Sequence, residues 1–179
     1  AIAEASPGLQ IIYAGKAHPK DEAGKAIIQD IHQQIERVHK RTTKLKVIYL
    51  PNYKMELGFA ITGGVDVWVN NPIRPYEASG TSGMKAVLNG IPNLSILDGW
   101  WVEGCIEGVT GWAIGGLDPR AELSDDDRDA LDAKDLYDKL ELEVMPKYYG
   151  DKAKWARLMR HAISLNASLF STHRQMEQY

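Results

Sequence analysis

Residues 9–50 read LQIIYAGKAHPKDEAGKAIIQDIHQQIERVHKRTTKLKVIYL, and this stretch decides the fold class. It begins with a short apolar run, Leu9–Ala14, and ends with a second one, Val47–Leu50. Between the two runs, apolar residues recur at helical spacing over Ala23–Val38, which predicts an amphipathic helix. Apolar, β-branched runs suit strands that are buried on both faces, as in a parallel sheet. The stretch therefore predicts a strand, a helix and a second strand.

The same alternation continues through the rest of the chain, which we treat as one domain over residues 1–179. We expect a short helix at Met55–Ile61, a strand at Val65–Val69, a helix at Thr81–Leu88 and strands at Asn93–Leu97 and Trp112–Ile114. We then expect an acidic loop over 118–132, a helix at Asp132–Val144 and a C-terminal helix and tail over 152–179. Alternating strands and helices predict an α/β fold with a doubly wound, Rossmann-like parallel sheet. Ligands of such sheets bind beyond the carboxyl ends of the strands.

The composition is that of an ordinary globular domain, with 179 residues of which 44% are hydrophobic. The 21 Lys and Arg against 24 Asp and Glu give a net charge of -3, so no basic field indicates a nucleic-acid or membrane partner. No apolar run approaches the roughly 20 residues that span a bilayer. Cys105 is the single cysteine, so nothing requires an oxidising compartment and we expect a cytoplasmic protein. Because the chain begins with Ala1 and not Met, we expect a fragment.

Three features have both a functional and a structural interpretation. Asp125–Asp127 lacks the Gly and the distal Glu of a calcium loop, so we expect a helix start capped by Ser124 and no metal. No neighbouring motif would activate Cys105, so we expect a buried thiol and not a nucleophile. Trp100 and Trp101 could stack on a sugar or pack in the core, and the sequence leaves both open.

The segment that carries chemical information is 70–101, NNPIRPYEASGTSGMKAVLNGIPNLSILDGWW. Gly80 and Gly83 would let the backbone approach a ligand closely, and the amides at the N-terminus of the expected helix favour a phosphate. Lys85 beside such a site can serve as a charge partner or as an imine-forming amine. Glu77 lies on the turn opposite, where its carboxylate could accept hydrogen bonds from sugar hydroxyls.

Residues 77–85, EASGTSGMK, continue through Leu88-Asn89-Gly90 and Leu97-Asp98-Gly99. This run closely resembles the pyridoxal-phosphate segment of the α-glucan phosphorylases, which act on glycogen, starch and maltodextrin. The Trp100-Trp101 continuation resembles the shorter bacterial and archaeal members. Further matches follow in the expected order at Gly15–Pro19, at Val47–Leu50 with Asn52–Lys54, and at Phe170–Thr172 with Arg174 and Tyr179.

The resemblance implies that pyridoxal 5'-phosphate is bound covalently to Lys85 as an aldimine. The catalytic residues that it implies are Lys85, Lys54 and Thr81. The cofactor contacts that it implies are Lys85, Thr81, Ser82, Lys54, Tyr53 and the backbone of Met55. The implied contacts to the transferred glucosyl unit are Glu77, Ser79 and Gly80. Lys54 stands where animal-type members carry an arginine. The lysine keeps the positive charge but cannot donate the two parallel hydrogen bonds of a guanidinium.

The reaction that the resemblance implies is phosphorolysis of the non-reducing terminal α-1,4-glucosidic bond. Inorganic phosphate and α-1,4-glucan would give glucose 1-phosphate and a shortened chain, with the cofactor phosphate as acid and base. The chain would be the C-terminal domain of a GT-B-type two-domain glycosyltransferase, without its first strand and helix and without the N-terminal domain. We therefore expect the isolated chain to be inactive. We also expect its exposed apolar surface to contact the rest of the protein or a second copy.

Two other functions stay open at this point. Nucleotide-sugar glucosyltransferases of the glycogen-synthase type share the two-domain fold and a related motif, and they generally lack a lysine matching Lys85. A non-catalytic glucan-binding domain would use Glu77 and the aromatic residues to hold a glucan without turnover. Bound pyridoxal phosphate would separate the first interpretation from both.

Overall fold

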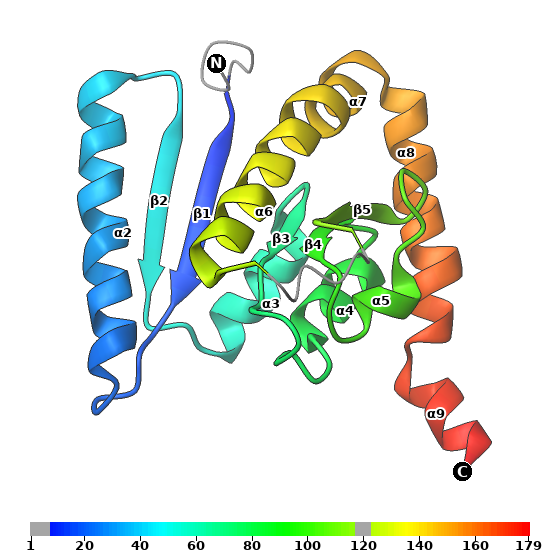
Figure 1. Cartoon of the computed structure of the whole chain (residues 1–179). Coiled ribbons are helices and arrows are strands. Elements are labelled where there is room, and N and C mark those ends of the chain that lie inside the picture. Colours follow the sequence, from blue (N-terminus) through cyan, green and yellow to red (C-terminus); the bar gives the residue numbers. More distant parts are fainter. Residues whose placement is uncertain (1–7, 117–122) are drawn as a thin grey trace. The chain divides into compact units, whose positions relative to one another are not determined.

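The computed structural model describes residues 8–116 and 123–179 (Figure 1). The chain divides into two compact units, Ala1–Phe59 and Ala60–Tyr179. None of the helices in the described ranges is long and apolar enough to cross a membrane.

The first unit is a strand, a helix and a strand, as residues 9–50 predict. Strands β1 (Gln10–Gly15) and β2 (Lys46–Pro51) pair in parallel, with Gln10 opposite Lys46 and Gly15 opposite Pro51. Helix α2 (Glu22–Arg41) connects them and packs against β2 (Figure 1). The ring of His32 lies 4.9 Å from that of Tyr49, between centroids. A parallel pair needs such a crossover, because the second strand must start at the same end as the first.

The second unit holds a parallel sheet in the order β3-β4-β5. Its strands are β3 (Trp68–Asn70), β4 (Asn93–Ile96) and β5 (Gly111–Ile114). The expected strand at Val65–Val69 is thus shifted and shortened. The amide of Trp68 donates to the carbonyl of Pro92 at 3.1 Å. Since Pro92 has no N–H to donate in return, regular pairing begins only at Trp68 and Asn93. We expected a single sheet, whereas the strands form two parallel sheets, one of β1 and β2 and one of β3, β4 and β5.

Helices occupy the connections and the C-terminal part of the second unit. Short helix α5 (Trp101–Gly104) follows β4 and was not expected, whereas α3 (Met55–Gly64) and α4 (Thr81–Leu88) were. After β5, α6 (Asp125–Lys139) runs through a π-helical turn, η2 (Leu140–Val144), into α7 (Met145–Gly150). Then α8 (Lys152–His161) runs through a second π-helical turn, η3 (Ala162–Ala167), and α9 (Thr172–Gln178) ends the chain.

The acidic loop expected over 118–132 is wrong for its second half, because α6 begins at Asp125. The Ser124 hydroxyl accepts a hydrogen bond from the Asp127 amide at 3.2 Å, so Ser124 is the N-cap that we expected. Three aspartates in the first turn favour this start, since the N-terminal end of a helix carries positive partial charge. Residues 118–122 of the expected loop lie outside the described residues. Within the described residues, no group of His, Cys, Asp and Glu side chains is arranged to hold a metal ion.

Both faces of β4 are covered, as a doubly wound sheet requires. Alternate residues of a strand point to opposite faces. Leu94 and Ile96 belong to a core cluster with Trp112 and Ile114 of β5 and with Val144, Trp155 and Leu158 of the C-terminal helices. Asn93 points the other way, and its Nδ2 donates to the Gly83 carbonyl of α4 at 3.3 Å.

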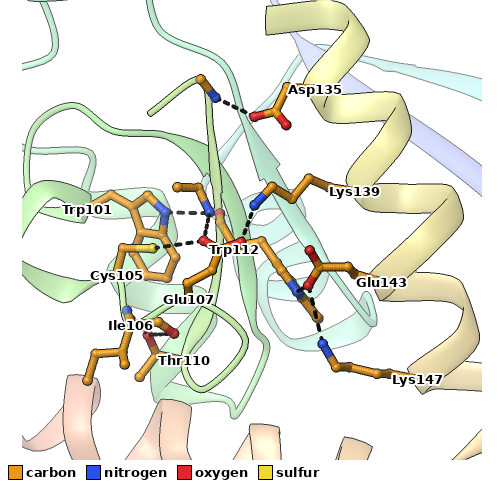
Figure 2. Close-up of polar contacts among 12 residues, drawn as sticks. Trp101, Cys105, Ile106, Glu107, Thr110, Trp112, Asp135, Lys139, Glu143 and Lys147 are labelled. Atoms are coloured by element: carbon orange, nitrogen blue, oxygen red, sulfur yellow. Dashed lines mark hydrogen bonds and ion pairs between the residues drawn. The ribbon is translucent and has the colours of Figure 1, made fainter. Parts of the chain in front are cut away.

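The residue that ties β5 to the C-terminal helices is Trp112 (Figure 2). Its side chain is fully buried, and its Nε1 donates to Glu143 Oε2 at 2.8 Å. Its ring stacks on Trp155 with 6.2 Å between centroids, and Lys147 Nζ lies 5.2 Å from the ring. Its carbonyl accepts from Trp101 Nε1 at 3.2 Å. One side chain therefore joins a strand, a π-helical turn and two helices.

Carboxylates meet the same strand from two directions (Figure 2). Glu107 Oε2 accepts from the Ala113 amide at 2.8 Å, while its Oε1 pairs with Lys139 of α6. Asp135 Oδ2 accepts from the Gly115 amide at 2.6 Å. These bonds fix α6 along the outer side of β5.

Replacing Trp112 by alanine should lower the free energy of unfolding by about 3–5 kcal/mol, because it leaves a large cavity and removes the Nε1 donor to Glu143. Unfolding in urea, followed by far-UV circular dichroism, measures this loss. Leu142→Ala is the matched control, since that side chain is 73% exposed in the adjoining turn. It should change stability by less than about 0.5 kcal/mol. Equal losses in both variants would contradict the assignment of Trp112 to the core.

Candidate active site

Helix α4 has the bounds that the sequence predicts, Thr81–Leu88. Gly80 precedes it in the left-handed region, with φ 86° and ψ 46°. Gly90, with φ 75°, follows Asn89 and ends the helix. Glycine adopts these angles without the steric cost that other residues meet, so the two glycines set both ends of this helix.

The two faces of α4 differ in what they can do. Gly83, Ala86 and Val87 are buried, whereas Thr81 and Lys85 are exposed and lie one turn apart on the same face. Gly80 has no side chain with which to cap the first turn. The Gly83 amide donates to the Gly80 carbonyl at 3.1 Å, so the amides of Thr81 and Ser82 are the candidates to bind an anion. A primary amine one turn from an anion-binding helix end is a donor set that fits an aldehyde carrying a phosphate group.

Gly83 is a glycine for a reason other than the close approach of a ligand. A Cβ at this position would lie 2.5 Å from Asn93 Oδ1 and 3.0 Å from Trp100 Nε1. Gly80 is similar, with Trp100 Cδ1 3.1 Å from the place of a Cβ. Protein side chains therefore fill the space that these glycines leave. We had expected both glycines to let the backbone approach a ligand. The structure shows that Asn93 and Trp100 lie where their side chains would be, and a ligand contact of the Gly80 backbone stays a prediction.

The two adjacent tryptophans are packing residues. Trp101 is fully buried and Trp100 is 6% exposed. Trp100 forms a tilted pair with Trp101 and an edge contact with Phe170, at 5.0 and 5.1 Å between ring centroids. Their rings are not available to stack on a sugar, which settles the choice that the sequence left open.

The loop before α4 is held by backbone and carboxylate contacts. Glu77 is half-buried, and its Oε1 accepts from the Ser79 amide at 3.3 Å. Its own amide donates to Asp98 Oδ2 at 3.0 Å. The Ser79 carbonyl accepts from the Trp100 amide at 2.8 Å. Glu77, Ser79 and Gly80 thus form one ordered turn that leads directly into Thr81, whereas Asp98 was not among the site residues expected from the sequence.

Tyr53, Lys54 and Met55 lie in the first unit, where β2 leads into α3. The Lys54 carbonyl accepts from the Gly58 amide at 2.8 Å, and Tyr53 Oη would lie 2.8 Å from a Cβ at position 58. Lys54 and Met55 are exposed, Met55 by 87%. The structure orders this turn, and the place of its three residues beside the cofactor stays a prediction.

The surroundings of Cys105 disfavour its thiolate form. Burial, and then the nearby Glu107 carboxylate, raise the pKa of its thiol to about 12. The Sγ atom lies 4.0 Å from Glu107 Oε2 (Figure 2). Cys105 is half-buried and not fully buried as we expected, and that it is not a nucleophile stays a prediction.

Solved structures with the same fold include HepE of Anabaena. Its complex with UDP-glucose gives a TM-score of 0.65 at 19% identity, over 99% of this chain and 41% of HepE. The complex with UDP and glucose gives 0.66 at 18% identity, with the same coverage. The fold is therefore α/β and Rossmann-like, that of the C-terminal domain of a GT-B glycosyltransferase.

Comparison with known sequences shows the family to which the chain belongs. A family model described as carbohydrate phosphorylase matches residues 3–110. The maltodextrin phosphorylase of Thermococcus litoralis is 48% identical over 173 residues, and the glycogen phosphorylases of Mycobacterium tuberculosis and Aquifex aeolicus are 42% identical over 176. Each alignment covers 96% of this chain, which spans 20%, 20% and 24% of these relatives respectively. The chain belongs to the carbohydrate phosphorylase family.

Replacing Gly83 by alanine should destabilise the protein by about 1–3 kcal/mol, because the new methyl group meets the buried Asn93 and Trp100. Gly64→Ala is the matched control: it also changes a helical glycine, but nothing lies within 4 Å of its added Cβ. It should be neutral or stabilising by up to about 1 kcal/mol. Urea unfolding of both variants measures the difference. A Gly83→Ala variant as stable as the parent sequence would contradict the close packing of α4.

At pH 8, Cys105 should react with a thiol reagent such as iodoacetamide roughly a thousandfold more slowly in the folded protein than in urea. The sign follows from the pKa, since raising it from 9.0 to about 12 lowers the thiolate fraction at every pH below that range. Glu107→Gln removes a charge that raises the pKa, so this variant should react faster than the unaltered protein. Equal labelling rates in buffer and in urea would refute the assignment.

Proposed function

We propose that this chain is part of an α-1,4-glucan phosphorylase. The parent enzyme would use inorganic phosphate to release glucose 1-phosphate from the non-reducing end of glycogen, starch or maltodextrin. The observation that carries the proposal is the exposed face of α4, where Lys85 lies one turn from a helix N-terminus that no side chain of Gly80 can cap. Membership of the carbohydrate phosphorylase family supports a cofactor-binding role for that face. Relatives carry the names maltodextrin phosphorylase and glycogen phosphorylase.

The residues of α4 fit pyridoxal 5'-phosphate as the cofactor. The amine of Lys85 would hold it covalently, and the first-turn amides with Thr81 and Ser82 would receive its phosphate. Tyr53, Lys54 and the backbone of Met55 are the further residues that we assign to that phosphate, on the family pattern. When bound, the cofactor supplies a phosphate group whose second pKa is near 6, which suits proton transfer near neutral pH.

The chain's own residues have distinct tasks in this reaction. Glu77 keeps one carboxylate oxygen on the Ser79 amide, and we assign its second oxygen to a hydroxyl of the transferred glucosyl unit. Ser79 and Gly80 would complete that contact. Lys54 contributes a point charge that offsets the repulsion between two phosphates, without the two-pronged geometry of an arginine. Positive charge held beside the reacting phosphate stabilises the charge that develops in the transition state.

The parent protein would also complete the fold. In a doubly wound sheet of order 3-2-1-4-5-6, removing strand 1 leaves one parallel pair and one parallel triplet. The described strands form one parallel pair and one parallel triplet. This supports the expectation that the first strand and helix of the domain belong to the parent enzyme. The expectation of an N-terminal domain is supported by the length of the relatives, of which this chain spans 20–24%. Because residues of the domain would be supplied by the rest of the parent, we expect the chain alone to be inactive. Separately, we propose that the parent enzyme is cytoplasmic.

Borohydride reduction of the full-length parent should leave a pyridoxyl group on Lys85, because this treatment traps an imine between the cofactor and a lysine. Peptide mapping by mass spectrometry locates the label. In Lys85→Ala the label and glucose 1-phosphate release should both be lost, with a fall in rate of at least about a thousandfold. Lys152→Ala, which removes a lysine lying 4.7 Å above the Tyr148 ring, is the matched control and should keep both.

An unlabelled but folded parent would refute the phosphorylase assignment. Turnover of a nucleotide sugar by that parent would then favour a glucosyltransferase of the glycogen-synthase type. Saturable glucan binding without any turnover would favour a binding domain.

A further inference from the structure

The carboxylate of Asp98 joins two segments that are distant in the sequence. Its Oδ2 accepts from the Glu77 amide at 3.0 Å, and its Oδ1 accepts from the Gly99 amide at 2.9 Å. Asp98 is half-buried. It is the second residue after β4, which ends at Ile96. It therefore fixes the start of the Glu77 loop to the carboxyl end of the central strand of its sheet.

The residues after Asp98 hold the same loop by two further contacts. The Trp100 amide donates to the Ser79 carbonyl at 2.8 Å. Gly99 has φ 54°, and a Cβ there would lie 2.5 Å from the Ser79 carbonyl oxygen. Each of the three residues 98–100 thus contacts the loop formed by residues 77–80. The buried ring of Trp100 also packs against Gly80.

These contacts determine what Asp98 can do. Each of its oxygens accepts a backbone N–H, and a carboxylate bonded in this way holds the backbone in place. Asp98 fixes the position of the Glu77 main chain. The Glu77 side chain accepts a hydrogen bond from the Ser79 amide, which orients its carboxylate. Displacing the main chain of Glu77 would displace the carboxylate and the amides of Ser79 and Gly80 together.

We propose that Asp98 is a positioning residue for sugar recognition, setting where Glu77, Ser79 and Gly80 meet the transferred glucosyl unit. This proposal rests on the proposed function, because it assigns the loop to the glucosyl unit of that reaction. Asp98 acts through the loop and does not touch the substrate. Its effect should therefore be on the binding and turnover of the sugar, while the cofactor on Lys85 is retained.

The test uses the full-length parent enzyme with Asp98→Ala, which removes both acceptors, and Asp98→Asn, which retains one carbonyl oxygen. A displacement of about 1 Å at a site can cost about a hundredfold in rate. We expect kcat/KM for glucan phosphorolysis to fall about a hundredfold in Asp98→Ala, and by a smaller factor in Asp98→Asn. The affinity for glucose 1-phosphate, measured by calorimetry, should fall at least about tenfold, while borohydride labelling of Lys85 stays at the level of the unaltered enzyme.

Asp151→Ala is the matched control, since the Asp151 side chain likewise accepts a backbone amide, that of Lys154 at 2.9 Å, at the start of α8. It should leave kcat/KM and the affinity for glucose 1-phosphate unchanged. Gly99→Ala is a second perturbation of the same contact and should reproduce the Asp98→Ala loss. If Asp98→Ala does not fold, Asp98→Asn and Gly99→Ala decide the matter by the same measurements.

Unchanged sugar affinity and kcat/KM in the folded variants would overturn the proposal, as would an equal loss in Asp151→Ala. Loss of the label on Lys85 together with activity would also overturn it, because that pattern indicates a general structural role. Hydrogen exchange of residues 76–80 gives a readout independent of turnover, and it should become faster in Asp98→Ala. A parent enzyme that carries no label and releases no glucose 1-phosphate before any substitution would instead refute the proposed function.

Discussion

Helix α4 approaches β4 so closely that position 83 has no room for a methyl group, and the candidate site depends on this contact. Asn93 and Trp100 occupy the space that a Cβ would need, and Asn93 bonds the Gly83 carbonyl. The buried face of α4 is thereby fixed against the sheet. Its opposite face then presents Thr81 and Lys85 to the outside with little freedom to rotate.

The same contact separates the two uses of small residues in this segment. A glycine-rich loop before a helix is commonly interpreted as a place where a ligand meets the backbone. Here the space beside Gly80 and Gly83 is filled by Asn93 and Trp100, and the phosphate that we propose would meet the amides at the start of the helix. One face of this eight-residue helix is therefore buried by Gly83, Ala86 and Val87, while the other exposes Thr81 and Lys85, the residues of the proposed site.

The sequence predicts elements well where the signals are local. Helix α4 has an N-terminal glycine turn and an Asn-Gly stop, and both of its ends were correct. Two expectations conflicted at the start of α6. The helix start capped by Ser124 is confirmed, whereas the acidic loop extended to residue 132 is wrong, because three aspartates favour the first turn of a helix. The burial of Trp100 and Trp101 depends on Phe170 and Ala162, which lie far away in the sequence, so no local pattern could decide it. Asp98 was missed for the same reason: its partner amide is 21 residues away.

The carboxylates on the outer side of β5 have a consequence for association between molecules. An edge strand with unpaired amides can accept a strand from another chain, which leads to aggregation. In β5 the amide of Ala113 is bonded to Glu107, and just beyond the strand that of Gly115 is bonded to Asp135. A strand arriving at this edge would find these two donors occupied. The Gly108 amide also donates to the Gly111 carbonyl at 2.8 Å, so local contacts, and not a further strand, block pairing along this edge.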